Sequence, residues 1–382
     1  MPTVNTDIYT ILNSAVAEAQ GTAVTPAINA GNFVDFGRTT MASADADVIF
    51  GKLLDRIGKT AVMNRVYNSK WRGVLATELE FGAILQRLRV APIDAQADDH
   101  FKISDALDIA DRDPFVIQLP SVEQTLYKDF KAYQFGVTIT REQLKSAFIS
   151  EGALAAFIEG IYTAVASSVE LYIERAIRLA INTYICEKYT LSKGADPRRH
   201  AVNLVTEYAA ETGKTTTAAK ALKDPDFLKW ATQFIGEIKT QLSEMSTAFS
   251  TGDIPTYEDA PMFIAHTTFI RGVNTYVVAD TFNADKLTAL SPDIEVSGWQ
   301  AIGSPLINQT YTSSDGQAKT IENLAVVGVL YSRRGLGATV FDHTSDTIYN
   351  PRGRYYNLWE HITCGYFADL AESGCVFYLA DT

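Results

Sequence analysis

Residues that could bind a metal are scattered along this chain. The histidines are His100, His200, His266, His343 and His361. None has a second histidine at the spacing that would place two imidazoles on one metal ion. The cysteines, Cys186, Cys364 and Cys375, are odd in number and far apart, so neither a metal site nor a disulfide framework is indicated. We therefore predict no metal site and a structural role for each histidine.

Phosphate-binding and nucleophile motifs are incomplete. Gly58-Lys59-Thr60 and Gly213-Lys214-Thr215 resemble the end of a phosphate-binding loop, which needs a further glycine five residues earlier. Leu53 and Tyr208 stand at those positions. Gly335-Leu336-Gly337 is too short for a dinucleotide-binding turn, and Gly-x-Ser-x-Gly is absent. The sequence predicts no catalytic or cofactor-binding residue and no enzyme. Catalytic groups can converge from distant positions, so an unrecognised soluble α/β enzyme stays an alternative.

One stretch of the chain is strongly acidic. Its aspartates are Asp94, Asp98, Asp99, Asp105, Asp108, Asp111 and Asp113. They do not form the Asp-x-Asp-x-Asp-Gly loop with a distal glutamate that binds calcium. We favour a solvated loop over a calcium site.

The composition is that of a folded, acidic protein. Its 382 residues, 47% of them hydrophobic, suffice for a sizeable core and two or three domains. The formal net charge of -12 disfavours nucleic-acid binding by the isolated chain, because phosphates repel a negative surface. The N-terminus has no basic leader before an apolar run, and no apolar stretch of about 18 residues occurs. We expect a chain kept in a reducing cytoplasm, with no membrane partner.

The N-terminal third is predicted to be extended or strand-like. Residues 8–18 fit a short helix, whereas residues 21–37 are small or turn-forming and indicate an extended arm. Residues 62–135 are strand-like, with partial alternation over 74–81 and a short apolar run over 115–119.

The middle of the chain has the clearest helical signal. Thr140 and Gln143 fit a capping box, in which each side chain bonds the backbone N–H of the other residue. After a break near residues 150–152, apolar residues recur at threes and fours from Leu154 to Tyr184. This pattern predicts a helix roughly 50 Å long at ~1.5 Å per residue. The positions that a coiled coil would use for charged pairs carry small uncharged residues, so packing on a sheet is favoured.

A second module is predicted downstream. Residues 193–223 indicate a polar connector and a domain boundary. Asp224 and Pro225 fit the N-cap and first position of an amphipathic helix. Its predicted inner face is Phe227, Leu228, Ala231, Phe234, Ile235, Ile238, Leu242 and Met245.

Buried strands are predicted in the last third of the chain. Residues 261–265 and 324–330 have the apolar character of buried strands, with a helix near 268–278. Aromatic and β-branched residues over 349–361 and 375–379 predict late strands that close a sheet.

Three short motifs occur in order around the long helix. They are Asp55-Arg56-Ile57-Gly58, Gln143-Leu144-Lys145-Ser146-Ala147-Phe148-Ile149 and Asn350-Pro351-Arg352-Gly353. With these motifs and its closing strands, the chain resembles the major capsid proteins of small short-tailed phages of the phi-twenty-nine type, which have the Hong Kong 97 fold. The resemblance runs from about residue 7 to the end, with poor matches over 200–225 and 280–320. No additional C-terminal immunoglobulin-like domain is expected.

The resemblance implies an α+β fold of the Hong Kong 97 type in five parts. They are an N-terminal arm at residues 1–58, an extended β-loop at 59–135, a peripheral domain with a long spine helix and sheet at 136–200, an axial α/β domain at 201–338, and closing strands of the peripheral domain at 339–382. The implied function is that of a major capsid protein, which self-assembles into the icosahedral or prolate shell around the double-stranded DNA of a tailed bacteriophage, a podovirus. The implied location is the virion capsid, after assembly in the bacterial host cytoplasm.

The same resemblance implies the partners. The chain would contact itself in pentamers and hexamers, a separate scaffolding protein, a portal or connector protein and, non-specifically, the packaged double-stranded DNA. A separate scaffold is expected because the first fifty or so residues lack the long charged helix of a fused scaffolding segment. A cellular encapsulin-like nanocompartment shell would share the fold and the assembly, and stays an alternative.

Five residues are candidate assembly contacts. Lys70, Trp71 and Arg72 would touch neighbouring subunits, unless they are simply exposed residues of the loop. Arg352 and Arg354 would pair with acidic groups of a neighbour. The alternative for these two is an exposed turn, where an ion pair contributes little.

Overall fold

The structure is a computed structural model that describes most of the chain. The described residues are 4–20, 28–29, 31–42, 48–49, 52, 71, 74, 85–93, 95, 117, 119–127, 130–147, 151–194, 196, 198–278, 291–300, 302–313 and 315–381. The chain forms two compact units. The first unit comprises Met1–Ala83, Asp129–Leu179 and Ala338–Tyr366, and the second comprises Ile84–Lys128, Ala180–Gly337 and Phe367–Thr382.

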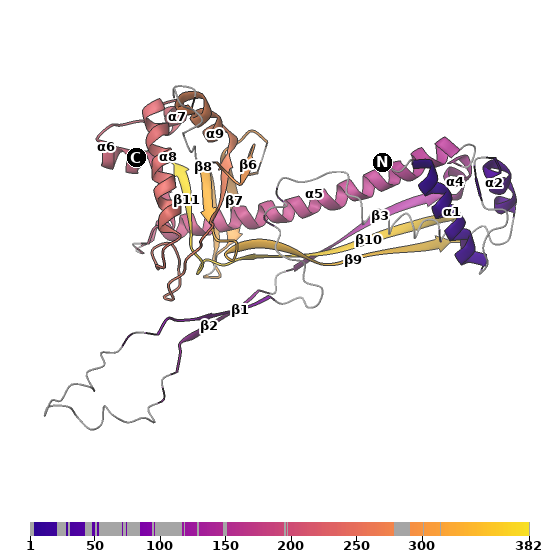
Figure 1. Ribbon diagram of the computed structural model, residues 1–382, viewed down its shortest axis with the longest axis horizontal. Helices are drawn as coiled ribbons and strands as arrows, with labels where there is room; N and C mark the ends of the chain where they lie inside the picture. The colour runs from indigo at the N-terminus through magenta and orange to yellow at the C-terminus, as the bar shows by residue number, and fades with distance from the viewer. Residues whose placement is uncertain are drawn as a thin grey trace. The chain divides into compact units, whose positions relative to one another are not determined.

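The first unit contains a three-stranded sheet. Its strands are β3 (Phe130–Thr140), β10 (Tyr355–Ala368) and β9 (Leu336–Asn350), with β10 in the centre (Figure 1). β10 pairs antiparallel with β3, and Trp359 lies opposite Gly136. A Cβ atom on Gly136 would stand 2.7 Å from the indole ring, so this register requires glycine. The predicted strand after residue 349 is confirmed.

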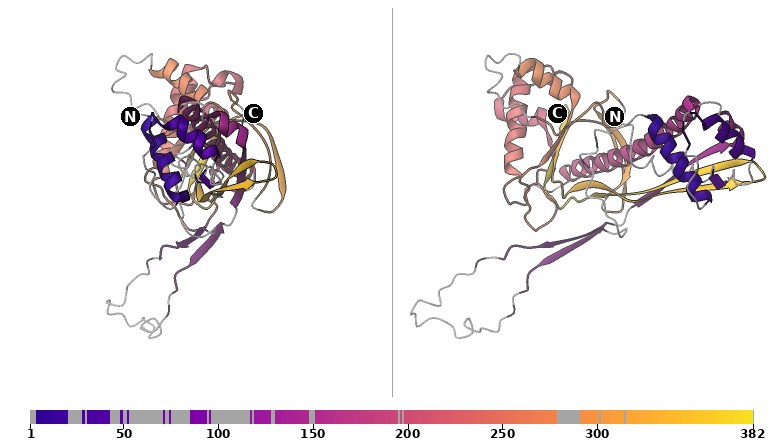
Figure 2. Two further views of the ribbon diagram at one scale, coloured as in Figure 1. Left: turned by 90° about the vertical axis from the view of Figure 1, so that its right-hand side faces the viewer. Right: turned by 45° about the vertical axis from the view of Figure 1, so that its right-hand side comes forward.

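Two N-terminal helices pack against this sheet. They are α1 (Val4–Gln20) and α2 (Phe33–Ala42), and Figures 1 and 2 both show them beside the ends of β3 and β10. Leu12 and Phe33 are buried in one apolar cluster with Tyr356 of β10. The predicted helix over 8–18 is confirmed, but the predicted extended arm over 21–37 is wrong from Phe33 onward. Small and polar neighbours hide the helical period there, and burial of the apolar residues stabilises the helix.

The capping box is confirmed. The Thr140 backbone N–H donates to Gln143 Oε1 at 3.0 Å, and the Gln143 N–H donates to Thr140 Oγ1 at 3.2 Å. Helix α4 (Arg141–Ala147) starts there. The long helix is also confirmed: α5 spans Glu151–Ser192 and contributes to both units. In the first unit, the Tyr172 ring packs on the rings of β3, so the predicted packing of this helix on a sheet is confirmed.

The second unit is built on a six-stranded sheet. Its order is β4 (Ala201–Asn203), β11 (Gly374–Leu379), β8 (Ala318–Tyr331), β5 (Met262–His266) and β6 (Ile294–Val296), with β7 (Leu306–Thr312) also paired to β8. Strands β5, β8 and β11 confirm three predictions. The helices of this unit are α6 (Leu204–Thr212), α7 (Ala218–Ala221), α8 (Pro225–Gln241), α9 (Thr267–Val273) and the π-helical turn η3 (Asn274–Val278).

Two predictions in this unit need correction. Residues 193–223 are not a polar connector, because β4, α6 and α7 form within them and Leu204 and Tyr208 are fully buried. Polar residues between these apolar positions concealed the pattern. Helix α8 begins as predicted, with Asp224 accepting from the N–H groups of its first turn. It ends at Gln241, however, so Met245 is exposed and not part of the inner face.

A two-stranded hairpin completes the second unit. Strands β1 (Leu85–Val90) and β2 (Val122–Tyr127) pair antiparallel, from Leu85 opposite Tyr127 to Val90 opposite Val122. The predicted strand over 115–119 is wrong at its described residues, since strand pairing starts only after Pro120, which lacks a backbone N–H. Of the predicted strand over 74–81, the structure describes Val74, which is buried in a 3-10 turn and not in a strand. Residues 75–81 and the seven aspartates between β1 and β2 lie outside the described residues.

Candidate assembly site

The β1–β2 hairpin has an exposed apolar face. Leu88 and Val90 of β1 and Val122 and Leu126 of β2 are between 54% and 62% exposed. The register places Val90 opposite Val122, so these side chains share one face of the hairpin. Two strands cannot bury such a face by themselves. A contiguous exposed apolar surface of this kind marks a site of interaction with another molecule.

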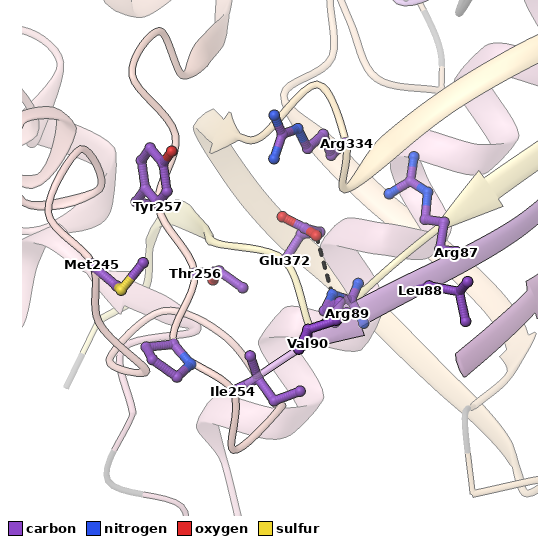
Figure 3. Close-up of a pocket in the computed structure, with 11 residues that line it drawn as sticks. Arg87, Leu88, Arg89, Val90, Met245, Ile254, Thr256, Tyr257, Arg334 and Glu372 are labelled. Atoms are coloured by element: carbon purple, nitrogen blue, oxygen red, sulfur yellow. Dashed lines mark hydrogen bonds and ion pairs between the residues drawn. The ribbon is translucent and has the colours of Figure 1, made fainter. Parts of the chain in front are cut away.

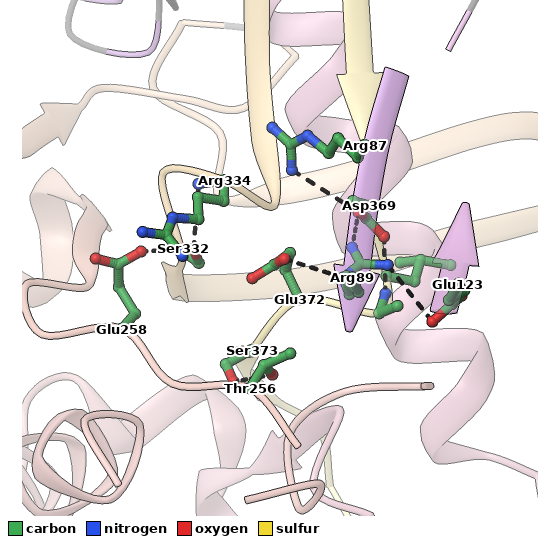
Figure 4. A network of polar contacts seen from close by, with 12 residues as sticks. Arg87, Arg89, Glu123, Thr256, Glu258, Ser332, Arg334, Asp369, Glu372 and Ser373 are labelled. Atoms are coloured by element: carbon green, nitrogen blue, oxygen red, sulfur yellow. Dashed lines mark hydrogen bonds and ion pairs between the residues drawn. The ribbon is translucent and has the colours of Figure 1, made fainter. Parts of the chain in front are cut away.

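The opposite face of the hairpin is held by charges. Arg89 forms ion pairs with Asp369, with Glu372 through Nε at 3.1 Å and with Glu123 at 3.7 Å (Figure 4). Burial lowers the pKa of Arg89, but Asp369 and Glu372 outweigh burial and leave that pKa raised. Arg87 stacks 4.4 Å from the centre of the Phe367 ring, and burial lowers its pKa. We call Arg89 with Asp369 and Glu372 the clasp.

The turn between β10 and β11, which carries Asp369 and Glu372, is held by hydrogen bonds to other parts of the second unit. Ser332 N–H donates to the carbonyl oxygen of Ser373 at 3.1 Å. Beneath the turn, the buried Lys188 ammonium donates to the carbonyl oxygen of Phe249 at 2.7 Å and to that of Leu370 at 3.5 Å. Burial lowers the pKa of Lys188 to about 7. The clasp therefore joins the hairpin to an ordered part of the second unit.

A cavity of about 470 Å³ lies beside β1 (Figure 3). One side is formed by Arg87 to Val90 of β1, and the other by residues between Met245 and Tyr257. Arg334 and Glu372 also line it. The Glu372 carboxylate is taken by the clasp, whereas exposed Arg334 has no acidic partner within ion-pair distance among the described residues. The cavity wall is thus mixed, with apolar side chains beside charged groups, and Arg334 is a lining cation without an ion-pair partner among the described residues.

Three of the five sequence-predicted contact residues are described by the structure, and none of the three lies on the β1–β2 hairpin. Lys70 and Arg72 lie outside the described residues. Trp71 is 3% exposed, and the Arg178 guanidinium lies 5.0 Å from its ring centre. Arg352 and Arg354 are exposed in the turn between β9 and β10, with the Arg354 carbonyl oxygen accepting from Arg141 N–H at 3.1 Å. Their roles as assembly contacts stay predictions.

Three of the described histidines form polar contacts within the fold, and the motif Gly213-Lys214-Thr215 begins at the end of a helix. His200 Nε2 lies 3.1 Å from Asp196, His266 caps α9 and His343 lies 2.9 Å from Glu360. Gly213 ends α6 in the left-handed region at φ 69°. Over the part of the chain that the structure describes, no group of three potential ligands is placed to hold a metal ion. Among the described helices, none combines the length and apolar character needed to cross a bilayer.

Sequence reasoning predicted an extended β-loop over residues 59–135, but not the bounds of β1 and β2 within it and not the clasp. The segment Leu85-Gln86-Arg87-Leu88-Arg89-Val90 does alternate, which is a strand signal. Arg87 and Arg89 face the protein while Leu88 and Val90 face outward, the reverse of the usual arrangement. The acceptors of Arg89 lie some 280 residues away in the sequence, so no local pattern could pair them.

Comparisons with known proteins identify the class. The fold is similar to that of a chain in the capsid structure of Staphylococcus phage Andhra, with a TM-score of 0.52, 12% identity, and 83% of this chain and 85% of that chain covered. It is also similar to a chain in the structure of the head fiber and inner core protein of native bacteriophage P68, with a TM-score of 0.51, 9% identity and coverage of 81% and 84%. No curated protein matches the sequence. The fold is that of Hong Kong 97-type phage capsid proteins, as predicted.

The family follows from the sequence. Residues 8–378 match the model of the family described as Phi29-like phage major capsid protein, and the chain belongs to that family. It is a structural protein of the virion capsid that assembles with itself into a phage shell.

Proposed function

We propose that the apolar face of the β1–β2 hairpin is a contact between subunits of the shell. The observation that carries this proposal is the set of exposed apolar side chains on that one face, namely Leu88, Val90, Val122 and Leu126. A stable protein interface buries roughly 800 Å² on each partner and has an apolar centre. Because the chain assembles with itself, a second copy is the partner always present at high local concentration.

The wider role follows the family. We infer an icosahedral or prolate shell of pentamers and hexamers that encloses the double-stranded DNA of a short-tailed phage and is assembled in the bacterial cytoplasm. A separate scaffolding protein and a portal or connector protein are the further partners, and the chain has no enzymatic role. The net charge of -12 supports a wall that holds the packaged DNA weakly and without sequence preference. The five-part domain division is likewise proposed.

Substitution of Leu126 tests the contact. Leu126→Asp places a charge on the exposed face without disturbing a buried residue, so the subunit should fold but form no closed shells. Leu126→Ile keeps both the apolar surface and the strand preference, and should assemble normally. The measurement is the yield of shells by sedimentation and negative-stain electron microscopy, with circular dichroism as the folding check. Normal shell yield from Leu126→Asp would refute the proposed contact.

A further inference from the structure

We propose that a proton on Lys188 and the docking of Arg89 oppose each other across the turn between β10 and β11, so that proton uptake by Lys188 loosens the β1–β2 hairpin. This turn carries Asp369 and Glu372, the two carboxylates of the clasp. The inference does not rest on the proposed subunit contact, because it concerns how the hairpin is attached within a single chain.

The turn between β10 and β11 is shared by two cations. Arg89 of β1 forms ion pairs with the side chains of Asp369 and Glu372 (Figure 4). Lys188 of α5 is fully buried, and its ammonium donates to the carbonyl oxygen of Leu370 in the same turn at 3.5 Å. Burial lowers the pKa of Lys188, while the charges of Asp369 and Glu372 act in the opposite direction. The same two carboxylates therefore attract both cations.

The other titratable groups of this cluster keep their charge state near pH 7. They come from α5, β11 and the segment before β4, and are Tyr184, Asp196, Arg198, Arg199, His200 and Cys375. Burial raises the pKa of Tyr184 above 10.0 and that of Cys375 to about 12. Burial and the charge of Lys188 lower the pKa of His200 from 6.5, and its hydrogen bond to Asp196 lowers the pKa of that carboxyl. The arginines stay charged. Lys188, with a pKa of about 7, is the member of this group that changes charge there.

The hairpin brings a net positive charge to the turn. Arg87 and Arg89 lie on β1 and Glu123 lies on β2, so docking places two cations and one anion beside the clasp carboxylates. When the hairpin leaves, those carboxylates lose these cations and attract an ammonium on Lys188 more strongly. The released state thus binds the Lys188 proton more tightly than the docked state does.

Thermodynamic linkage sets the direction of the effect. Because the released state binds more protons, a falling pH favours release of the hairpin, and a pH that rises through about 7 favours docking. The coupling is reciprocal, so docking of Arg89 weakens proton binding by the same factor as the proton weakens docking. Coupled sites commonly show factors of about 5 to 150, and we expect about fivefold because the backbone of the turn separates the two cations.

Amide hydrogen exchange of unassembled subunits tests the effect of the proton. In the wild type, the protection factors of the β1 and β2 amides, which correct for the intrinsic pH dependence of exchange, should rise about fivefold from about pH 6 to about pH 8.5. Lys188→Met has no proton to release there, so its protection factors should stay level. Lys193→Met removes an exposed lysine just after α5 and should behave as the wild type does. Level protection in the wild type, or the same rise in Lys188→Met, would overturn the proposal.

The reciprocal effect is measured on Lys188 itself. Arg89→Met removes the docked cation, so the pKa of Lys188 should rise by about 0.7, which corresponds to a fivefold change in proton affinity. The measurement is a pH titration of the lysine side-chain carbon signals by NMR, in which Lys188 titrates apart from lysines of ordinary pKa, about 10.4. Arg271→Met, which removes an arginine paired with Glu295, is the control and should leave Lys188 unchanged. An unchanged or lowered pKa in Arg89→Met would overturn the proposal even if Lys188→Met does not fold.

Discussion

The β9–β10 hairpin of the first unit and the β1–β2 hairpin of the second are stabilised in opposite ways. β10 has a third strand, β3, beside it, and Tyr356 is fully buried in the apolar cluster. β1 and β2 have only each other as hydrogen-bonded partners among the described strands. Their apolar side chains are exposed, and charged groups hold the inner face.

The difference indicates what each hairpin is for. Burial of a large aromatic side chain stabilises by several kcal/mol and keeps one fixed geometry. A hairpin held through an ion-pair clasp retains an apolar face whose burial free energy is released only when a partner covers it. The first hairpin is stabilised within the folded subunit, and we propose that the second is completed by assembly.

The largest effect is expected from a substitution in the buried hairpin, β9–β10. Tyr356→Ala removes a fully buried ring that lies 4.7 Å from the Tyr349 ring, and should lower the free energy of unfolding by about 3–5 kcal/mol. Denaturant titration of unassembled subunits measures this. Leu126→Ala, at a 54% exposed position, is the control and should change stability by less than ~0.5 kcal/mol. If the two variants lost equal free energy of unfolding, the two hairpins would not differ in how they are stabilised.

The clasp should give the next largest effect. Arg89→Met removes the ion-pair partner of Glu372 and leaves Asp369 with only the 3.7 Å ion pair to Arg87, which should cost about 3 kcal/mol and raise amide hydrogen exchange in β1 and β2. Adding Asp369→Asn and Glu372→Gln should recover part of that loss, because the stranded charges are removed. A triple variant no more stable than Arg89→Met would mean that the arginine acts by packing and not by charge.

Lys188, which lies beneath the turn between β10 and β11, should make the free energy of unfolding depend on pH. Its folded pKa is about 7, below the value of 10.5 for an unburied lysine, so the unfolded chain binds more protons between these values. Stability then rises with pH by up to ~1.4 kcal/mol per pH unit in that window, or about 2 kcal/mol from pH 7 to about 8.5. Lys188→Met should remove this rise. The carbonyl oxygens of Phe249 and Leu370 keep their bonds from the N–H groups of Gly374 and Thr251.

Thermal or denaturant unfolding at several pH values compares the two proteins. The difference between wild type and Lys188→Met isolates this one group from the other titrating residues. Parallel stability curves across pH 7 to about 8.5 would show that Lys188 does not titrate in this range.

The sequence predicts those elements whose stabilising residues are local. The capping box at Thr140, the N-cap at Asp224 and the period of α5 all depend on contacts within a few residues, and each prediction is confirmed. Helix α2 and the elements within 193–223 depend on apolar residues that bury against distant strands, so their short patterns were misinterpreted. The clasp joins Arg89 to Asp369 and Glu372, and no local pattern showed that Arg89 faces inward.

The smallest effect is expected at the junction of α4 with β3, the strand that pairs with β10. Thr140 ends β3 and caps α4, and its bond with Gln143 is reciprocal, so Thr140→Ala should cost about 1 kcal/mol. Gln143→Ala should cost less, because the Thr140 N–H can reach water. Since the two bonds form one unit, the double variant should lose less than the sum of the single losses when subunit unfolding is measured. Fully additive losses would mean that each bond forms independently, and that the junction of β3 with α4 is set by the surrounding apolar cluster instead of by the capping box.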